Sequence, residues 1–251
     1  MEKIDYLIKY LLNEREQEIE IPTDEVSKKR LYRALVNIRR PKPISNEFLN
    51  IEDEYLQEEL LKNKIVSASD IEGKNKIALW HGDITKVEID AIVNAANSQG
   101  LGCFVQNHNC IDNQIQTFAG VQMRLECNEY MKTIDYNLET SKCFITKGYN
   151  LPSKNVIHVV GPIIENEVTE EKEKQLEYCY KNCLELARKN NIKTIAFPSI
   201  STGVFRFPKD REAQIAIKTI KEYLEKDSSF EKIVFVTYID EDYNYYKEIL
   251  Q

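Results

Sequence analysis

The hydrophobic pattern of residues 1–70 has the three- and four-residue spacing of amphipathic helices. Three helices are predicted, in the stretches IDYLIKYLL (4–12), TDEVSKKRLYRALVNIRR (23–40) and SNEFLNIEDEYLQEELLKNK (45–64). Thr23 is the expected N-cap of the second helix, because its hydroxyl can accept a hydrogen bond from the first helical turn. No glycine interrupts this part of the chain before Gly73. The pattern therefore predicts a helical N-terminal extension over residues 1–73.

The pattern changes near Lys74, where short runs of β-branched and apolar residues alternate with helical stretches. The predicted strands are KIALW (76–80), DAIVNAAN (90–97), CFITKGY (143–149), NVIHVVG (155–161), TIAFPSI (194–200) and KIVFVTYI (232–239). Helices are expected near residues 110–131, 170–190, 209–226 and 241–250. Strands that are apolar nearly throughout and separated by helices are typical of a mostly parallel sheet with both faces covered. Residues 74–251 are therefore predicted to form an α/β domain.

The chain of 251 residues is acidic, with a net charge of −7. Such a charge repels phosphate backbones, so we expect no nucleic-acid polymer as a partner. The first residues lack the apolar core of a signal peptide, and no apolar run approaches the ~20 residues that span a bilayer. We therefore expect a cytoplasmic protein with no membrane partner. Its six cysteines are then thiols or metal ligands rather than disulfides.

In α/β sheets, ligands bind at the carboxyl ends of the strands, so the segments that follow the strands are the candidate site. These segments are WHGDIT (80–85), VNAANSQGLGCFVQNHNCIDN (93–113) and SISTGVFRFP (199–208). In the last segment, Ser201, Thr202 and Gly203 could direct consecutive backbone N–H groups at a phosphate.

The second segment carries Cys103, His108 and Cys110 in the spacing C-x4-H-x-C. Thiolate and imidazole ligands favour Zn²⁺, and a loop as polar as VQNHN is not typical of a buried core. Three protein ligands leave one coordination position open, as in catalytic zinc sites. An open zinc could lower the pKa of a bound water toward ~7, or orient an oxygen of the substrate, and the residues leave both roles open.

The remaining cysteines, Cys127, Cys143, Cys179 and Cys183, are possible fourth ligands. Cys127 falls late in a predicted helix and Cys143 in a predicted strand. Cys179 and Cys183 have the four-residue spacing of one helix face, so we expect both to face the core.

Several of these segments resemble the macrodomain family, which binds ADP-ribose. The motifs that carry the resemblance are GDI (82–84), IVNAAN (92–97), IDNQIQTFAG (111–120), VIHVVGP (156–162) and ISTGVFRFP (200–208). The resemblance covers residues 74–251 and implies a three-layer α/β/α fold with a mixed, mostly parallel sheet. The Cys/His insertion and the N-terminal extension look like those of zinc-containing microbial macrodomains. These act as mono-ADP-ribosyl hydrolases alongside a sirtuin-type ADP-ribosyltransferase.

The resemblance implies how the nucleotide part of ADP-ribose binds. The Asp83 carboxylate would accept a hydrogen bond from the adenine amino group, beside the Ile84 N–H, and Tyr238 would stack on the ring. The residues alone also allow Asp83 to be a capping residue and Tyr238 an ordinary strand-end tyrosine. The diphosphate would lie on a loop of backbone donors formed by Ser201, Thr202, Gly203, Val204 and Phe205.

Two further residues match the family at the distal ribose. Asn97 would hydrogen-bond this ribose, and Asp112 matches the acid that positions the attacking water. Asp112 could at the same time be a helix N-cap or first-turn acid. Asn94 is interpreted as a turn former, and Asn113 is a weaker site candidate.

The sequence departs from the family at three positions. Gln116 stands where relatives commonly have His, and Arg206 stands where they usually have Gly. Arg206 could contact the diphosphate or narrow the cleft. His81 stands where Gln is frequent, and we interpret it as a structural residue.

The leading functional hypothesis is a zinc-dependent hydrolase that removes mono-ADP-ribose from protein side chains and releases ADP-ribose. It depends on Asn97, Asp112 and the Cys/His loop. One alternative is a reader module that binds ADP-ribose without cleaving it. Another is deacetylation of O-acetyl-ADP-ribose, which would use the same pocket.

Overall fold

The computed structural model describes residues 2–251. Its first part contains the three predicted helices, α1 (Lys3–Asn13), α2 (Glu25–Ile38) and α3 (Asn46–Leu61). The prediction of Thr23 as the N-cap of α2 is wrong, because the side chain of Asp24 caps this helix and accepts a hydrogen bond from the Ser27 N–H at 2.8 Å. Asp24 directly precedes the first helical residue, which places its carboxylate within reach of the unpaired N–H groups of the first turn.

A mixed sheet with strand order β2, β3, β9, β8, β5, β7, β6 lies at the centre of the α/β part. Its strands are β2 (Gly73–Lys74), β3 (Ile77–His81), β5 (Ala91–Ala96), β6 (Cys143–Lys147), β7 (Asn155–Val160), β8 (Thr194–Phe197) and β9 (Lys232–Thr237). The strands from β3 to β7 in this order run parallel, and the edge strands β2 and β6 pair antiparallel. The prediction of a mixed, mostly parallel sheet is confirmed. A separate parallel pair, β1 (Val66–Ser67) with β4 (Val87–Glu88), was not predicted.

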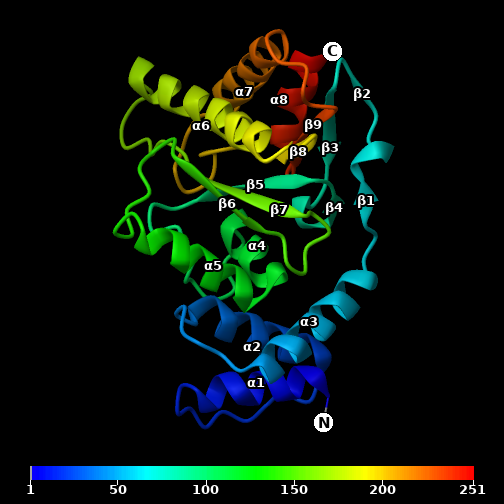
Figure 1. Cartoon of the computed structure of the whole chain (residues 1–251), viewed down its shortest axis with the longest axis vertical. Helices are drawn as coiled ribbons and strands as arrows, with labels where there is room; N and C mark the ends of the chain where they lie inside the picture. The colour runs from blue at the N-terminus through cyan, green and yellow to red at the C-terminus, as the bar shows by residue number, and fades with distance from the viewer. Residues whose placement is uncertain (1) are drawn as a thin grey trace.

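Helices cover both faces of the sheet, as the three-layer prediction requires (Figure 1). On one face lie α4 (Ile111–Ala119) and α5 (Val121–Lys132), and on the other lie α6 (Glu170–Lys189), α7 (Lys209–Leu224) and α8 (Asp240–Leu250). The single helix expected near residues 110–131 is divided at Gly120, whose φ of +93° interrupts the helical path.

The two faces of the sheet carry separate apolar cores, because successive strand residues point to opposite sides. Val93 packs in the core under α6 to α8, whereas its neighbour Ile92 packs in the core under α4 and α5. Cys179 and Cys183 are fully buried in the first of these cores, which confirms the prediction from their spacing.

The helices α1, α2 and α3 pack around a third apolar core that includes Leu7, Tyr32 and Phe48. Val121, the first residue of α5, is part of the same core. In Figure 1 the three helices lie beyond α4 and α5, on the side away from the sheet. The expected boundary between residues 73 and 74 stays a prediction. None of the helices within residues 2–251 is long and apolar enough to cross a membrane.

Candidate active site

A cleft of about 630 Å³ opens at the carboxyl ends of β3, β5, β8 and β9. This is where a parallel sheet binds its ligands, and the volume is that of a small-molecule pocket. Apart from the weaker candidate Asn113, the predicted site residues all line it: Asp83, Ile84, Asn97, Cys103, His108, Cys110, Asp112, Ser201, Thr202, Gly203, Val204, Phe205 and Tyr238. The fold therefore brings the three candidate segments together, while the role of each residue stays a prediction.

Asp83 follows β3 and caps the short 3-10 helix Ile84–Lys86. Its Oδ1 accepts hydrogen bonds from the Thr85 N–H at 3.0 Å and the Thr85 hydroxyl at 2.6 Å. The other oxygen, Oδ2, lies 3.6 Å from Lys86 Nζ. Capping, one of the two roles considered for Asp83, is present, and Oδ2 can still accept a hydrogen bond from a ligand.

Tyr238 follows β9 and is 77% exposed, so its ring offers a flat surface at the edge of the cleft. His81 Nε2 lies 3.2 Å from the Tyr238 carbonyl oxygen. The His81 ring also stacks on Tyr243, with 5.2 Å between ring centroids. His81 therefore supports the backbone that carries Tyr238, in agreement with the structural role expected for it.

The loop of residues 199–205 follows β8 and supplies backbone donors to the cleft. Ser201 has φ +68° and packs against Gly161 so closely that a Cβ at residue 161 would lie 2.0 Å from Ser201 Oγ. In the part of the chain that the structure describes, the N–H groups of Thr202, Gly203 and Val204 donate to no other protein atom. Free N–H groups in a concave loop are donors for an anion, as expected for a diphosphate loop.

Arg206 ends this loop in a backbone conformation with φ +60°, which favours glycine. This conformation fits the glycine that the family resemblance implies at this position. The Arg206 side chain is exposed and does not line the cleft. Its position supports neither the phosphate contact nor the narrowing of the cleft that the sequence suggested.

A buried acid that the sequence reasoning missed holds the start of this loop. Glu212, in the first turn of α7, accepts hydrogen bonds from the Ile200 N–H at 3.1 Å, from the Tyr246 hydroxyl at 3.0 Å and from the Tyr180 hydroxyl. Burial raises the pKa of the Glu212 carboxyl to about 8. The sequence does contain a signal for this buried acid: the helical spacing places Glu212 on the face of α7 that packs against the core.

Asn97 and Asp112, the two residues expected at the distal ribose, are in direct contact. Asn97 Nδ2 donates to Asp112 Oδ2 at 3.2 Å, and Asn94 Nδ2 donates to Asp112 Oδ1 at 2.8 Å. Asp112 lies in the first turn of α4, whose N-cap is Cys110. Burial raises the pKa of the Asp112 carboxyl to about 6, which the hydrogen bond from Asn94 counteracts.

The interpretation of Asn94 as a turn former is wrong. Asn94 lies inside β5 with its side chain fully buried, and it contacts His158 Nδ1 at 3.0 Å as well as Asp112. Its position in the strand directs the amide toward α4, where the buried carboxylate needs a donor. His158 Nε2 in turn lies 2.9 Å from Thr146 Oγ1. A buried polar chain thus runs from Asp112 through Asn94 and His158 to Thr146.

His158 stays neutral in this chain, because burial lowers its pKa to about 3. His158 lies within the motif VIHVVGP, but the motif alone assigns it no role. The sequence signal for a role of His158 is that it is a polar residue in the middle of an otherwise apolar strand.

Cys103, His108 and Cys110 form the predicted cluster. Their ligand atoms all lie within 4.8 Å of one another, and Cys103 Sγ lies 3.6 Å from His108 Nδ1. Cys110 Sγ accepts a hydrogen bond from the Asn113 N–H at 3.4 Å as the N-cap of α4. Among residues 2–251, no other Cys, His, Asp or Glu joins this group. Two sulfurs and one imidazole nitrogen at this spacing fit the donor set of Zn²⁺.

Three residues near the cluster face elsewhere. The Cys127 thiol accepts a hydrogen bond from Gln116 Nε2 at 3.6 Å in the interior. Gln116 itself is buried behind Asp112 and does not line the cleft. Asn113, the weaker site candidate, is also fully buried and donates to the Val105 carbonyl at 2.9 Å, so it holds the loop rather than facing the cleft.

Comparison with known proteins agrees with this geometry. The sequence model of the Macro domain family matches residues 93–216. A Treponema medium protein named Protein-ADP-ribose hydrolase is 43% identical over 252 residues, which cover 98% of this chain and 97% of that protein. Its similarity therefore includes the N-terminal helices as well as the α/β part.

Solved structures show the same fold. The Oceanobacillus iheyensis macrodomain with ADP has a TM-score of 0.63 and 36% identity, over 71% of this chain and 92% of that one. The Trypanosoma brucei macrodomain in complex with ADP-ribose has a TM-score of 0.69 and 26% identity, over 87% of this chain and 95% of that one. The Treponema medium relative is 43% identical along nearly the whole chain, and the cleft is built from the expected segments. The chain therefore belongs to the macrodomain family.

Proposed function

We propose that this protein binds ADP-ribose in the cleft and hydrolyses the bond between mono-ADP-ribose and a modified protein side chain. The order of the strands carries the proposal. Along β3, β9, β8 and β5, the sheet presents Asp83, Tyr238, the loop 201–205 and Asn97 in that sequence. This is the chemical order of adenine, diphosphate and distal ribose. At about 4.8 Å per strand, the three steps from β3 to β5 span roughly 14 Å.

Asp112 is the proposed general base at the distal end. Its two oxygens already accept hydrogen bonds from Asn94 and Asn97, which fix the carboxylate at the wall of the cleft. In the proposed reaction it accepts the proton of a water whose oxygen bonds to the anomeric carbon. The bond between that carbon and the side-chain oxygen breaks, and the electron pair leaves with this oxygen, which is then protonated by solvent.

Asn97 is the proposed ribose ligand. Its Nδ2 hydrogens are used by Asp112 and by the Gly102 carbonyl at 3.1 Å. Its Oδ1 accepts one hydrogen bond, from the Gln99 N–H at 3.0 Å, and can accept a second from a ribose hydroxyl. Asn97 therefore links the position of the ribose to that of Asp112.

Cys103, His108 and Cys110 would hold a zinc ion beside these residues, as their donor atoms and spacing allow. When bound with an open position, the ion supplies a Lewis acid for an oxygen ligand at the end of the cleft. A module that only reads ADP-ribose would need Asp83, Tyr238 and the loop, but neither the buried acid nor the cluster. The free cysteines of the described chain agree with the proposed cytoplasmic location. The family resemblance alone suggests a sirtuin-type transferase as the enzyme that adds the modification.

Elemental analysis and chelation test the metal part of the proposal. We expect about one zinc per chain, and we expect hydrolysis of a mono-ADP-ribosylated protein to fall on chelation and on Cys103→Ala. Cys143→Ala is the matched control, since Cys143 lies in β6 outside the cleft. Full activity of protein shown to be metal-free would contradict zinc dependence.

A further inference from the structure

The N-terminal helix α2 contacts the loop that carries the cluster. Arg33 Nη2 donates to the His108 carbonyl oxygen at 2.7 Å and to Asn113 Oδ1 at 2.9 Å. Asn37, one helical turn further on, is 1% exposed and accepts a hydrogen bond from the Asn107 N–H at 2.9 Å. Two side chains of α2 therefore bind the backbone of Asn107 and His108, which are adjacent residues of this loop.

A turn of the loop lies where the side chains of α2 contact it. Asn107 has φ +54°, in the left-handed region, which asparagine adopts more readily than most non-glycine residues. The turn closes through the His108 N–H, which donates to the Val105 carbonyl at 3.3 Å. The hydrogen bonds between the side chains of Arg33 and Asn37 and the loop backbone therefore hold the turn that presents the His108 ring.

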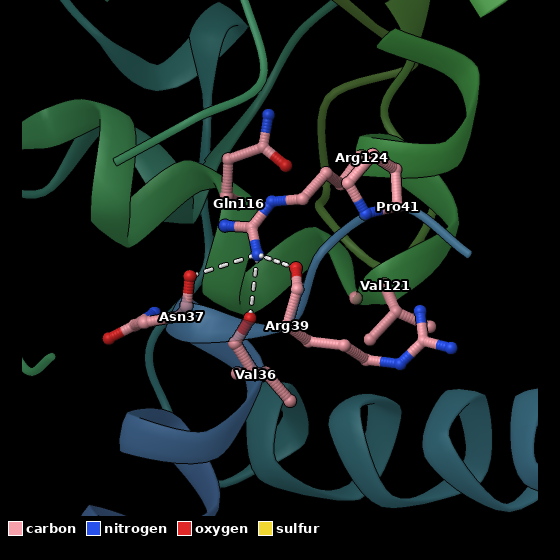
Figure 2. A pocket seen from close by; sticks show the side chains of 8 residues that line it. Val36, Asn37, Arg39, Pro41, Gln116, Val121 and Arg124 are labelled. Atoms are coloured by element: carbon pink, nitrogen blue, oxygen red, sulfur yellow. Dashed lines mark hydrogen bonds between the residues drawn. The ribbon is translucent and has the colours of Figure 1, made fainter. Parts of the chain in front are cut away.

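A second connection ties the beginning of the loop to the end of α2. Figure 2 shows the Arg124 guanidinium directed at the carbonyls of Val36, Asn37 and Arg39, to which its Nη1 donates at 2.7, 3.0 and 2.8 Å. These carbonyls lie at the C-terminal end of α2, where the helix dipole favours a cation. The Nε of Arg124 donates at 2.8 Å to the carbonyl of Leu101, two residues before Cys103.

Phe104 completes this connection. The guanidinium groups of Arg124 and Arg40 lie over its ring, at 4.6 and 4.7 Å from the centroid. Cation–π contacts of a buried guanidinium are stabilising and directional. Phe104, the residue next to Cys103, is thus held by Arg124 of α5 and by Arg40, which follows the C-terminal end of α2.

We propose that α2 is the positioning element of the cluster: through Arg33, Asn37 and the Arg124 contact, it holds Cys103, His108 and Cys110 in the geometry that binds the cation. This inference rests on the proposed metal site. It gives the N-terminal extension a function at the active site, which its own apolar core does not explain. Hydrogen bonds that orient metal ligands commonly change metal affinity by roughly 10- to 100-fold.

The test compares two arginines of α2 in the full chain. Arg33→Gln removes the contacts to His108 and Asn113, whereas Arg30→Gln changes an exposed arginine on the same helix. Zinc retention against graded concentrations of a chelator gives the affinity of each protein. We expect a loss of roughly 10-fold or more for Arg33→Gln and none for Arg30→Gln. Equal retention by both variants would overturn the proposal.

A second readout keeps the two proposals separate. In metal-free protein, the rates at which iodoacetamide modifies Cys103 and Cys110, followed by peptide mass spectrometry, report on the loop without any ion. We expect these rates to rise about 3-fold or more in Arg33→Gln, with the rate of the buried Cys127 unchanged. If the wild-type protein binds no zinc but these rates still rise, the metal site is wrong and the positioning by α2 stands. Unchanged rates would refute the positioning itself.

Asn37→Ala gives an independent check on folding. This variant removes the contact to Asn107 and a hydrogen bond of 2.9 Å to Thr117, so it is expected to lower the melting temperature as well. Calorimetric affinity for ADP-ribose should stay within about twofold of wild type in both variants, since no residue of α2 lines the cleft. Folded protein that binds ADP-ribose normally but loses zinc supports the proposal, whereas normal zinc affinity in Asn37→Ala would contradict it.

Discussion

Asn97 donates a hydrogen bond to Asp112 at 3.2 Å, across 15 positions of the chain that include the whole Cys/His loop. The strand β5 ends one residue before Asn97, and α4 begins one residue before Asp112, so the loop between them is closed at its base. Its ligand atoms and the buried carboxylate therefore line the same wall of the cleft.

Asp112→Asn should separate hydrolysis from binding. The substitution keeps the shape of the side chain but removes the proton acceptor, so we expect turnover to fall by roughly 10²- to 10⁴-fold. Affinity for ADP-ribose, measured by calorimetry, should change little, because the adenine and diphosphate contacts remain. A variant that retains wild-type turnover would show that Asp112 is not the base.

Asp83→Asn tests adenine recognition without removing the cap. The amide oxygen can still accept from the Thr85 N–H, as Asp83 Oδ1 does at 3.0 Å. The second carboxylate oxygen becomes a donor and would meet the adenine amino group unfavourably. We expect calorimetry to show that the affinity for ADP-ribose falls by roughly 10-fold. Asp210→Asn, at an exposed position of α7, is the control. Unchanged affinity would place the adenine elsewhere.

Tyr238→Ala should weaken ADP-ribose binding by about 1–3 kcal/mol, the usual contribution of a base stacked on an aromatic ring. Tyr238→Phe keeps the ring and should bind as the wild type does. Because Tyr238 is 77% exposed, neither change should alter the melting temperature. Equal affinities of the Ala and Phe variants would exclude stacking.

Glu212 gives the fold a pH dependence. Its folded pKa of about 8 lies above its ordinary value, so the stability it supports is complete at acidic pH and is lost as pH rises toward and through 8. The groups that face it are the Tyr180 and Tyr246 hydroxyls, and the charge of nearby Asp242 raises its pKa further. Urea unfolding between pH 5 and 9 should therefore show a steeper loss of stability for the wild type than for Glu212→Gln. If the free energy of unfolding falls with pH to the same extent in both proteins, Glu212 is not the group that titrates.

The sequence predicted those parts of the site that lie in local motifs at strand ends. Asp83, Tyr238 and the loop 201–205 follow strands whose apolar runs are unmistakable, and parallel strands bring such residues to one edge. The Cys/His cluster was predictable for the same reason, because its three ligands lie on one short loop.

The parts that were missed depend on partners far apart in the chain. Arg33 and Asn113 are 80 positions apart, and no local pattern pairs them. Asn94 was misread because an asparagine at a strand end suggests a turn, whereas the buried carboxylate of α4 requires it as a donor. The role of Arg206 was also not predictable from the residue type, because the positive φ of its backbone, rather than its charge, decides which residue the position favours.

The most direct test of the central claim is a time course of free ADP-ribose released from a mono-ADP-ribosylated protein, with the zinc content of the enzyme measured beforehand. The account predicts that release exceeds one equivalent per chain and continues until the substrate is consumed. Wild-type protein that binds ADP-ribose in the calorimeter but releases none from any modified substrate would contradict hydrolysis and leave a reader of ADP-ribose.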